Sequence, residues 1–343
     1  MNLGLIEGFF GPPWPESDRL AFAPLLRELG FDFFLYAPKA DPFLRKRWRE
    51  LWTGEFRDKL ARYAAHFRAH GVRFGVGLSP FELHQLADGR RRLAEKVQQL
   101  DVDVLGLFFD DMPVHEDLGA RQLEAIDIVR NATRARIIFC PTFYTPDPIL
   151  EKVFGKKPER YFDEIRTAPA EIEFAWTGPK VIPEEIPAAH LDEAARLLGR
   201  KPFLWDNLFA NDGPRNCKFL KLRPPSGRTP DAFARTSGWA WNPMNQAALS
   251  RITLRASRHA IAEGLAPEAA LERAIREECS EGLAAILGRE REALLTEGLD
   301  KLLPEKKEAL STELRRFANE PVAREIGAWL AGDYVVGSEC LTD

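Results

Sequence analysis

Two neighbouring carboxylates, Asp110 and Asp111, directly follow the apolar run Val104–Phe109. A short apolar run of this kind is typical of a strand that is buried on both faces, as the strands of parallel sheets are. Two acids at the carboxyl end of such a strand could not both be buried and ionised without a large desolvation cost. We therefore expect both side chains to face a polar crevice or a ligand.

An adjacent pair of acids suits one kind of sugar chemistry. Many glycosidases place two carboxyl groups on opposite sides of the anomeric carbon, at least ~5 Å apart, and sequence neighbours such as Asp110 and Asp111 could not easily do so. The pair fits better if the substrate supplies the nucleophile. The 2-acetamido carbonyl of an N-acetylhexosamine can attack its own anomeric carbon and form an oxazoline. The protein then needs one acid for the leaving oxygen and one carboxylate to orient the acetamido N–H.

The proximity of Asp110 and Asp111 should also change their pKa values. An isolated Asp has a pKa near ~3.9 and is a poor acid at neutral pH. A second negative charge or burial raises that pKa, so the pair should titrate as a coupled unit. One carboxyl group can then stay protonated as the general acid while its neighbour stays ionised.

The elements that carry this pair alternate between short apolar runs and amphipathic stretches over residues 1–263. The predicted strands are Leu3–Phe9, Phe31–Tyr36, Arg73–Leu78, Val104–Phe109, Arg136–Cys140, Glu171–Trp176, Pro202–Trp205 and Gly238–Trp241. The predicted helices include Glu16–Leu29, Phe56–His70, Arg90–Leu100, Asp117–Arg130, Ala188–Leu198 and Asn245–Ala262. This alternation predicts the α/β class and a (β/α)8 TIM barrel. An open doubly wound sheet alternates in the same way, but it usually carries a Gly-rich phosphate loop, and the stretch from Glu7 to Trp14 does not fit GxGxxG.

After about residue 263 the pattern becomes helical. Apolar residues recur every four positions from Leu271 to Leu287, and a second stripe follows Pro304, which suits the first position of a helix. A strand-like run returns only at Tyr334–Val336. We predict a C-terminal α-helical domain over residues 264–343 that packs on the barrel, and the alternative is that it forms a homodimer surface.

Polar, small and aromatic residues gather just past the predicted strand ends. In a parallel barrel these ends share one face, where active sites are built. Trp and Tyr rings can cover the apolar face of a sugar, whereas Asp and Asn bind its hydroxyl groups. Each residue alone could be a turn or a helix cap, but seven converging strand ends favour a sugar site. The residues are Glu7–Gly8, Tyr36–Asp41, Asp110–Asp111, Cys140–Tyr144, Trp176–Lys180, Trp205–Asn207 with Asn211–Asp212, and Trp241–Pro243.

Two other functions stay open. An Asp pair can also hold a divalent metal in a barrel hydrolase, and the further candidate ligands are Glu7, Asp41, Asp206 and Asp212. The second alternative is a sugar-binding protein without turnover, against which the acid pair argues.

Composition narrows the class of protein further. The chain has 343 residues, of which 45% are hydrophobic, and a net charge of -4. It therefore lacks the basic excess that would indicate a nucleic-acid partner. Its four cysteines are scattered, without a CxxC pair, which favours reduced thiols in a cytoplasmic protein over a zinc site. We expect neither a signal peptide nor association with a membrane.

Seven short motifs carry a resemblance to a known family. They are Glu7–Gly11, Tyr36–Lys39, Phe109–Asp111, Cys140–Tyr144, Trp176–Val181, Trp205–Asn207 with Asn211–Asp212, and Asn242–Met244. In this order they resemble family 84 glycoside hydrolases, which are the O-GlcNAcases and their bacterial β-N-acetylglucosaminidase relatives. The resemblance runs from residue 3 to about 255 and does not include the residues after about 263.

The resemblance implies retaining, substrate-assisted hydrolysis of terminal β-linked N-acetylglucosamine on a glycan or glycoprotein, without a metal or cofactor. It implies that Asp110 polarises the acetamido nitrogen, and that Asp111 is first the general acid and then the base. Tyr144 would hydrogen-bond the acetamido group, Asn207 would support the acid pair and the acetamido pocket, and Trp205 would wall that pocket. The residues implied to hold the sugar hydroxyl groups are Gly8 (through its backbone), Lys39, Asp212 and Asn242.

The chain departs from the family pattern at four positions near the expected cleft. The family often has Tyr, Arg, Asp and Glu where this chain has Phe10, Pro12, Ala40 and Phe143. None of these changes removes a proposed catalytic group, so they bear on the hydrogen bonds at the cleft rim and on the aglycone preference. We expect Asp206 to orient its neighbours rather than to contact the substrate.

Overall fold

Eight parallel strands close into one barrel, and each strand pairs with its neighbours in the sequence. The computed structural model describes residues 2–337 and 340–342. The strands are β1 (Asn2–Glu7), β2 (Phe33–Tyr36), β3 (Arg73–Leu78), β4 (Val104–Phe108), β5 (Arg136–Cys140), β6 (Glu173–Trp176), β7 (Phe203–Asp206) and β8 (Gly238–Trp241). β8 returns to β1, with Gly238 opposite Asn2, and closes the barrel. The predicted (β/α)8 fold is confirmed.

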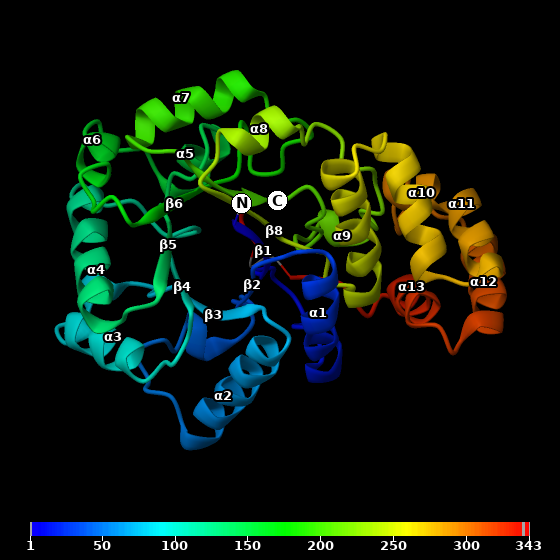
Figure 1. Ribbon diagram of the computed structural model, residues 1–343, viewed down its shortest axis with the longest axis horizontal. Coiled ribbons are helices and arrows are strands. Elements are labelled where there is room, and N and C mark those ends of the chain that lie inside the picture. The colour runs from blue at the N-terminus through cyan, green and yellow to red at the C-terminus, as the bar shows by residue number, and fades with distance from the viewer. Residues whose placement is uncertain (1, 338–339, 343) are drawn as a thin grey trace.

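Helices surround the barrel on its outer side (Figure 1). They are α1 (Glu16–Glu28), α2 (Gly54–Ala69), α3 (Gly89–Gln98), α4 (Leu118–Ala132), α5 (Ile149–Phe154), α6 (Tyr161–Ile165), α7 (Ala188–Leu198), α8 (Pro230–Ala234) and α9 (Ala247–Ala262). α2 shows why they form. Its buried residues Leu60, Tyr63, Ala64 and Phe67 follow the helical period, and the Thr53 hydroxyl caps its first turn. The longer helices lie where the periodicity predicts them, whereas the short α5, α6 and α8 were not predicted.

Side chains from the first residues of four strands fill the end of the barrel where the strands begin. The Phe33 and Phe203 rings lie 6.2 Å apart, and the Arg136 guanidinium lies 5.2 and 5.5 Å from their centres. Arg136 also pairs with Glu173. Gly4 makes room for this layer, because a Cβ there would come within 2.0 Å of the Phe33 ring. This packing closes one end of the barrel, so a ligand site belongs at the carboxyl ends of the strands.

The helices after residue 263 build a second core against the outer side of α9. They are α10 (Pro267–Glu278), α11 (Glu281–Thr296), α12 (Pro304–Leu314) and α13 (Pro321–Ala331). Leu249 and Ile252 of α9 share this core with Leu271 and Leu287. The apolar stripe is divided between α10 and α11 because the chain leaves the helical conformation at Cys279. The extension therefore packs on the barrel as expected, whereas the domain boundary at residue 263 and the homodimer stay predictions.

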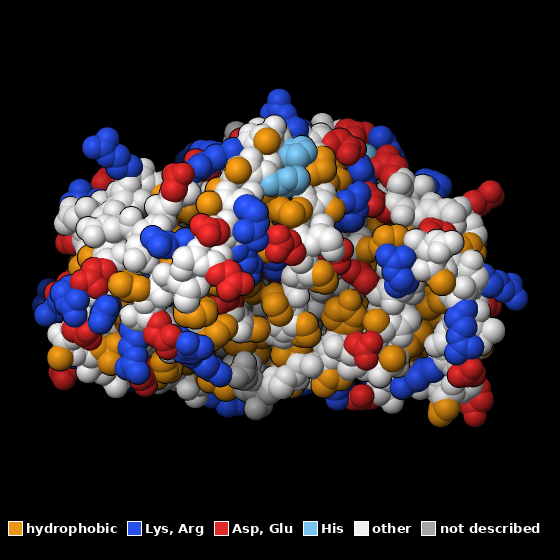
Figure 2. Space-filling model, turned by 90° about the horizontal axis from the view of Figure 1, so that it is seen from below, with side chains coloured by type: hydrophobic (Ala, Val, Ile, Leu, Met, Phe, Trp, Pro, Cys, Tyr) orange, Lys and Arg blue, Asp and Glu red, His pale blue; other side chains and the backbone are white. Residues whose placement is uncertain are grey.

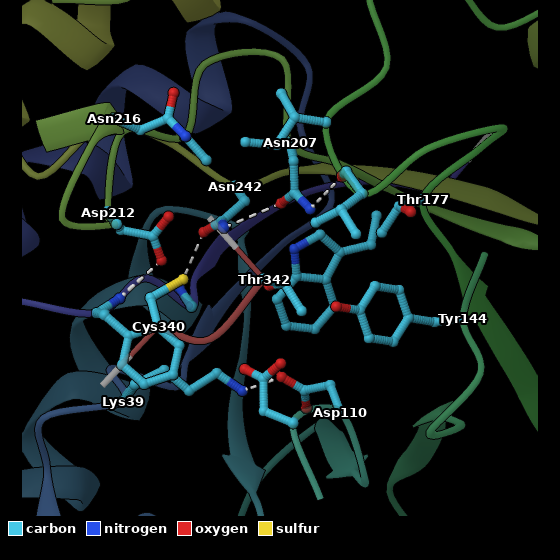
Figure 3. Close-up of a pocket in the computed structure, with 18 of the residues that line it drawn as sticks. Lys39, Asp110, Tyr144, Thr177, Asn207, Asp212, Asn216, Asn242, Cys340 and Thr342 are labelled. Carbon is cyan, nitrogen blue, oxygen red and sulfur yellow. Dashed lines mark hydrogen bonds and ion pairs between the residues drawn. The ribbon is translucent and has the colours of Figure 1, made fainter. Parts of the chain in front are cut away.

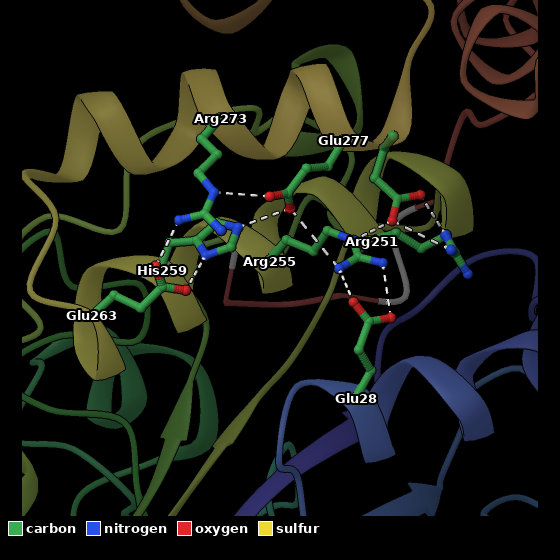
Figure 4. Close-up of polar contacts among 8 residues, drawn as sticks. Glu28, Arg251, Arg255, His259, Glu263, Arg273 and Glu277 are labelled. Carbon is green, nitrogen blue, oxygen red and sulfur yellow. Dashed lines mark hydrogen bonds and ion pairs between the residues drawn. The ribbon is translucent and has the colours of Figure 1, made fainter.

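A network of ion pairs joins the second core to the barrel (Figure 4). Arg255 of α9 pairs with Glu28 of α1 and with Glu278 of α10. One turn further on, the His259 ring contacts Glu277 of α10 at 2.8 Å. Single exposed ion pairs add little stability, but a connected network with partly buried members adds more. The network thus joins α10 to α9 and α1 in addition to the apolar contacts of the second core.

The run Tyr334–Val336 is not a strand, so the strand-like interpretation of these residues was wrong. A new strand needs a free sheet edge to pair with, and a closed barrel has none. Val336 instead packs in a loop conformation against Phe10 and Cys217.

The molecular surface agrees with the ordinary charge balance of the sequence. Acidic and basic side chains are mixed over the face shown in Figure 2, which carries no continuous basic area. Within residues 2–337 and 340–342, the helices lack the length and apolar character needed to cross a membrane. All four cysteines carry thiols, as predicted.

Candidate active site

Asp110 and Asp111 line one cavity at the carboxyl ends of the strands. Both side chains are largely buried, with 8% and 7% of their residue surface exposed. Neighbours on a strand normally point to opposite faces. Asp111 departs from that geometry because its backbone is left-handed, with a φ of 55°, a conformation that Asp tolerates better than most side chains do. The acid pair therefore faces a cavity, as the sequence predicts.

The structure brings all nine predicted site residues to this cavity (Figure 3). They come from the carboxyl ends of six strands that are far apart in the sequence. They are Gly8 after β1, Lys39 after β2, Asp110 and Asp111 after β4, Tyr144 after β5, Trp205, Asn207 and Asp212 in and after β7, and Asn242 after β8. Their placement is as predicted, and their roles remain proposals.

A chain of hydrogen bonds holds one wall of the cavity. The Gly8 N–H donates to Asn242 Oδ1 at 3.3 Å, Asn242 Nδ2 donates to Asn207 Oδ1 at 3.0 Å, and Asn207 Nδ2 donates to the Val181 carbonyl at 2.9 Å. Gly8 is required here because a Cβ would come within 2.6 Å of the Trp205 ring. The amide groups and the indole are thus fixed before any ligand arrives, which is what a preorganised binding site requires.

The two acids have different surroundings. The Lys39 ammonium forms an ion pair with one oxygen of Asp110. The Oδ1 atoms of Asp110 and Asp111 are buried without a hydrogen-bond partner among the described residues. Buried polar atoms are normally satisfied, so these two oxygens indicate where a ligand supplies the missing donors.

The pKa of Asp111 is raised to about 6, chiefly because burial penalises the charged form and also because Asp110 lies beside it. Lys39 and Arg45 act in the opposite direction. Burial also raises the pKa of the Tyr144 hydroxyl well above its usual range, so this group stays a neutral donor. A carboxyl group with a pKa near 6 is protonated often enough near neutral pH to serve as a general acid.

Arg45 is a site residue that the sequence did not reveal. Its Nη2 donates to the backbone carbonyl of Asp111 at 3.0 Å, and its guanidinium lies 5.8 and 5.6 Å from the ring centres of Phe10 and Phe81. Arg45 thus holds the left-handed turn at Asp111 from behind the cavity. It sits near the motif Tyr36–Lys39, but nothing in its spacing indicates this contact.

Ten other residues line the cavity. Phe10, Cys140, Thr177 and Val181 belong to the strand-end motifs, although the sequence assigned no role to them, whereas six residues were missed: Ile182, Ala210, Gly213, Asn216, Cys340 and Thr342. Phe10 is the departure from the family pattern that reaches the cavity, whereas Pro12 and Ala40 are exposed. The Phe143 ring packs edge-on against Tyr161 at 5.3 Å.

Three of the four additional carboxylates that could complete a metal site are engaged elsewhere, and the fourth, Asp212, lines the cavity and accepts a hydrogen bond from the Phe10 N–H at 2.8 Å. Glu7 pairs with Arg19 at 2.6 Å, Asp41 accepts a hydrogen bond from Tyr36 at 2.7 Å, and Asp206 is fully buried and pairs with Arg228 at 2.6 Å. The described part of the chain contains no group of three or more His, Cys, Asp or Glu residues arranged to hold a metal ion. The Asp206 contacts agree with the expectation that it positions its neighbours, since it also accepts from the Trp239 indole at 3.1 Å.

A closed (β/α)8 barrel with an acid pair in a cavity at the carboxyl ends of its strands has the architecture of a barrel enzyme. The family described as beta-N-acetylglucosaminidase matches residues 3–290. The chain therefore belongs to this family, glycoside hydrolase family 84. The match extends into α11, so the resemblance is not confined to the barrel as the motifs alone indicated.

Individual relatives agree with this assignment. The Protein O-GlcNAcases of Rattus norvegicus and Mus musculus are each 29% identical over 258 residues, which cover 70% of this chain and 28% of theirs. The matched part of the chain thus spans under a third of the length of these relatives. A mutant of the Thermobaculum terrenum O-GlcNAc hydrolase shares the fold, with a TM-score of 0.75, 24% identity, and coverage of 96% of this chain and 74% of that chain.

Proposed function

We propose that the chain is a retaining β-N-acetylglucosaminidase that removes terminal β-linked N-acetylglucosamine from glycans or glycoproteins through an oxazoline intermediate. The observation that carries the proposal is the acid pair. Asp110 and Asp111 share one cavity, yet Lys39 forms its ion pair with Asp110 rather than with Asp111, and the pKa of Asp111 is raised to about 6. Neighbouring identical side chains are thereby prepared for two different tasks.

In the first step Asp111 donates its proton to the glycosidic oxygen while the acetamido oxygen attacks the anomeric carbon. Asp110 accepts a hydrogen bond from the acetamido N–H and stabilises the positive charge that develops on the oxazoline. Tyr144, whose hydroxyl stays protonated, donates to the acetamido oxygen. In the second step Asp111 takes a proton from water, which attacks from the face that the aglycone left. Two inversions give net retention.

The remaining polar groups would bind the sugar itself. Lys39, Asp212, Asn242 and the Gly8 backbone stand along the cavity, and the Trp205 ring closes it beside Gly8. Every step uses groups of the chain or of the substrate, so the scheme requires no metal and no cofactor.

The decisive experiment is hydrolysis of an aryl β-N-acetylglucosaminide, with the double variant Asp110→Asn/Asp111→Asn as the inactive control. The sugar released first should be the β anomer by ¹H NMR, and a thiazoline mimic of the oxazoline should inhibit competitively. Release of the α anomer first would contradict neighbouring-group participation. Loss of activity on dialysis against a chelator would favour the metal-dependent hydrolase, and binding without turnover would favour the sugar-binding protein.

A further inference from the structure

A segment from the far end of the sequence enters the cavity that holds the acid pair. Cys340 and Thr342 line this cavity together with Asp110 and Asp111 (Figure 3), although they follow α13 and lie about 100 residues beyond β8. Leu341 between them is 53% exposed. Leu341 and Thr342 form a turn, which directs Leu341 to the outside while Cys340 and Thr342 line the cavity.

The segment reaches both sides of the proposed sugar site. Thr342 lies beside the Tyr144 hydroxyl in the cavity, and Tyr144 is the proposed partner of the acetamido group. Cys340 lies on the opposite side of the cavity, near Lys39, Asp212 and Asn242 (Figure 3). These three residues are the proposed partners of the sugar hydroxyl groups.

Val336 anchors the segment on the wall of the cavity. It is 6% exposed and packs with Phe10 and Cys217 in a small apolar cluster that Cys340 joins. The loop that carries Cys217 is itself fixed to α13, because the Trp329 indole donates to the Cys217 carbonyl at 2.9 Å. The neighbouring Val335 is 62% exposed and takes no part in the cluster.

We propose that residues 340–342 occupy the sugar site of the ligand-free protein and that the sugar must displace them to bind. The inference rests on the proposed function, because Thr342 lies inside the cavity beside Tyr144, in the space where the acetamido group would bind. The segment then acts as an intramolecular competitor. It raises the apparent dissociation constant of every ligand of this site by one over the open fraction, which is the fraction of molecules whose site the segment does not occupy. It does not change the chemical step.

Two double variants of the full chain test the competition. The release variant, Val336→Ala/Thr342→Ala, removes the inward contacts, and the matched control, Val335→Ala/Leu341→Ala, changes outward-facing residues of the same segment. The KM for an aryl β-N-acetylglucosaminide should fall up to about tenfold in the release variant if the open fraction is near one tenth, with kcat unchanged. The control should match the parent chain. A KM that is unchanged or higher in the release variant would overturn the proposal, and a higher KM would mean that the segment completes the site.

Labelling of Cys340 by a thiol reagent gives a readout that needs no turnover. Cys140 and Cys217 are buried, so a Cys279→Ser background removes the other partly exposed thiol. The release variant should label faster than the parent chain, and a saturating thiazoline mimic should accelerate labelling of the parent. Slower labelling with the mimic would show that segment and ligand bind together and would refute displacement. If neither the parent chain nor any variant hydrolyses the aryl glycoside, the proposed function fails. Equal Cys340 labelling rates in the parent chain and the release variant, measured without any sugar, would separately refute the position of the segment.

Discussion

Raising the pH through the pKa of Asp111 should switch off the general acid. The pKa of about 6, against an ordinary value of 3.8, follows mainly from burial. The protonated fraction is then about nine tenths at pH 5 and about one tenth at pH 7. An Asp with the ordinary pKa would be protonated about once in 1,600 molecules at pH 7, so burial enlarges the active population at pH 7 roughly 140-fold.

The assay compares kcat/KM for two aryl β-N-acetylglucosaminides between pH 5 and pH 8. With a poorly departing methylphenol, kcat/KM should fall about tenfold from pH 5 to pH 7 and tenfold more by pH 8, because the free enzyme must be protonated to donate. With dinitrophenol, which leaves without a proton, the decline should be much weaker. Asp111→Asn should lose about 10²- to 10⁴-fold on the methylphenyl substrate and retain most of its activity on the dinitrophenyl substrate.

The surface carboxylate Asp163, whose side chain is 61% exposed, offers a matched control. Asp163→Asn should keep the parent profile on both substrates. Asp111 would not be the general acid if the alkaline decline survived in Asp111→Asn, or if both substrates declined equally, because a group other than the leaving-group acid would then titrate.

Four further outcomes follow from the surroundings of individual charged groups. Because the pKa of Asp111 is raised in the folded state, the free energy of unfolding of the parent chain falls as the pH rises from about 4 to 6. Asp111→Asn does not undergo this loss. In urea titrations its free energy of unfolding should exceed that of the parent by on the order of 3 kcal/mol at pH 8 and should not exceed it at pH 4. Asp110→Ala should lower kcat on both aryl substrates, because its carboxylate acts in ring closure, and burst kinetics would locate the loss. Arg45→Met should lower kcat on the methylphenyl substrate more than on the dinitrophenyl one, whereas equal losses would point to general misfolding. Arg228→Met should cost about 3–5 kcal/mol of unfolding free energy, because it leaves Asp206 buried and unpaired, and the additional change Asp206→Asn should recover part of this in denaturant melts.

The barrel could be predicted because each strand is an apolar run bounded by residues that favour turns. Val104–Phe108 and Gly238–Trp241 are examples in which composition and length leave little choice. The short helices α5, α6 and α8 escaped prediction because five or six residues contain less than two helical turns, so no apolar period can develop. The run Tyr334–Val336 misled for the opposite reason, since its local preference for a strand found no edge to pair with.

The residues of the site also fall into those that the sequence predicts and those that it does not. Gly8, Lys39 and Asn242 could be predicted because parallel strands bring their carboxyl ends to one face whatever lies between them. The contacts of Arg45 and Thr342 depend on how loops and the distal segment settle on that face, and no spacing in the sequence encodes them. Conformational choices of this kind are fixed by tertiary packing alone.

The difference between the two acids rests on where the nearby cations bind. A direct ion pair lowers the pKa of a carboxyl group by roughly 1–3 units, which would return a buried Asp to the range of a poor acid. Lys39 makes its direct ion pair with Asp110 rather than with Asp111. Arg45 approaches Asp111 but donates to its backbone carbonyl rather than to its carboxylate. The guanidinium therefore holds the left-handed turn in place without taking up the carboxylate oxygens. The position of Asp111 and the proton affinity of its carboxyl group are thus set by separate contacts. Arg45 can hold the backbone of Asp111 in place and still leave its carboxyl group able to bind a proton.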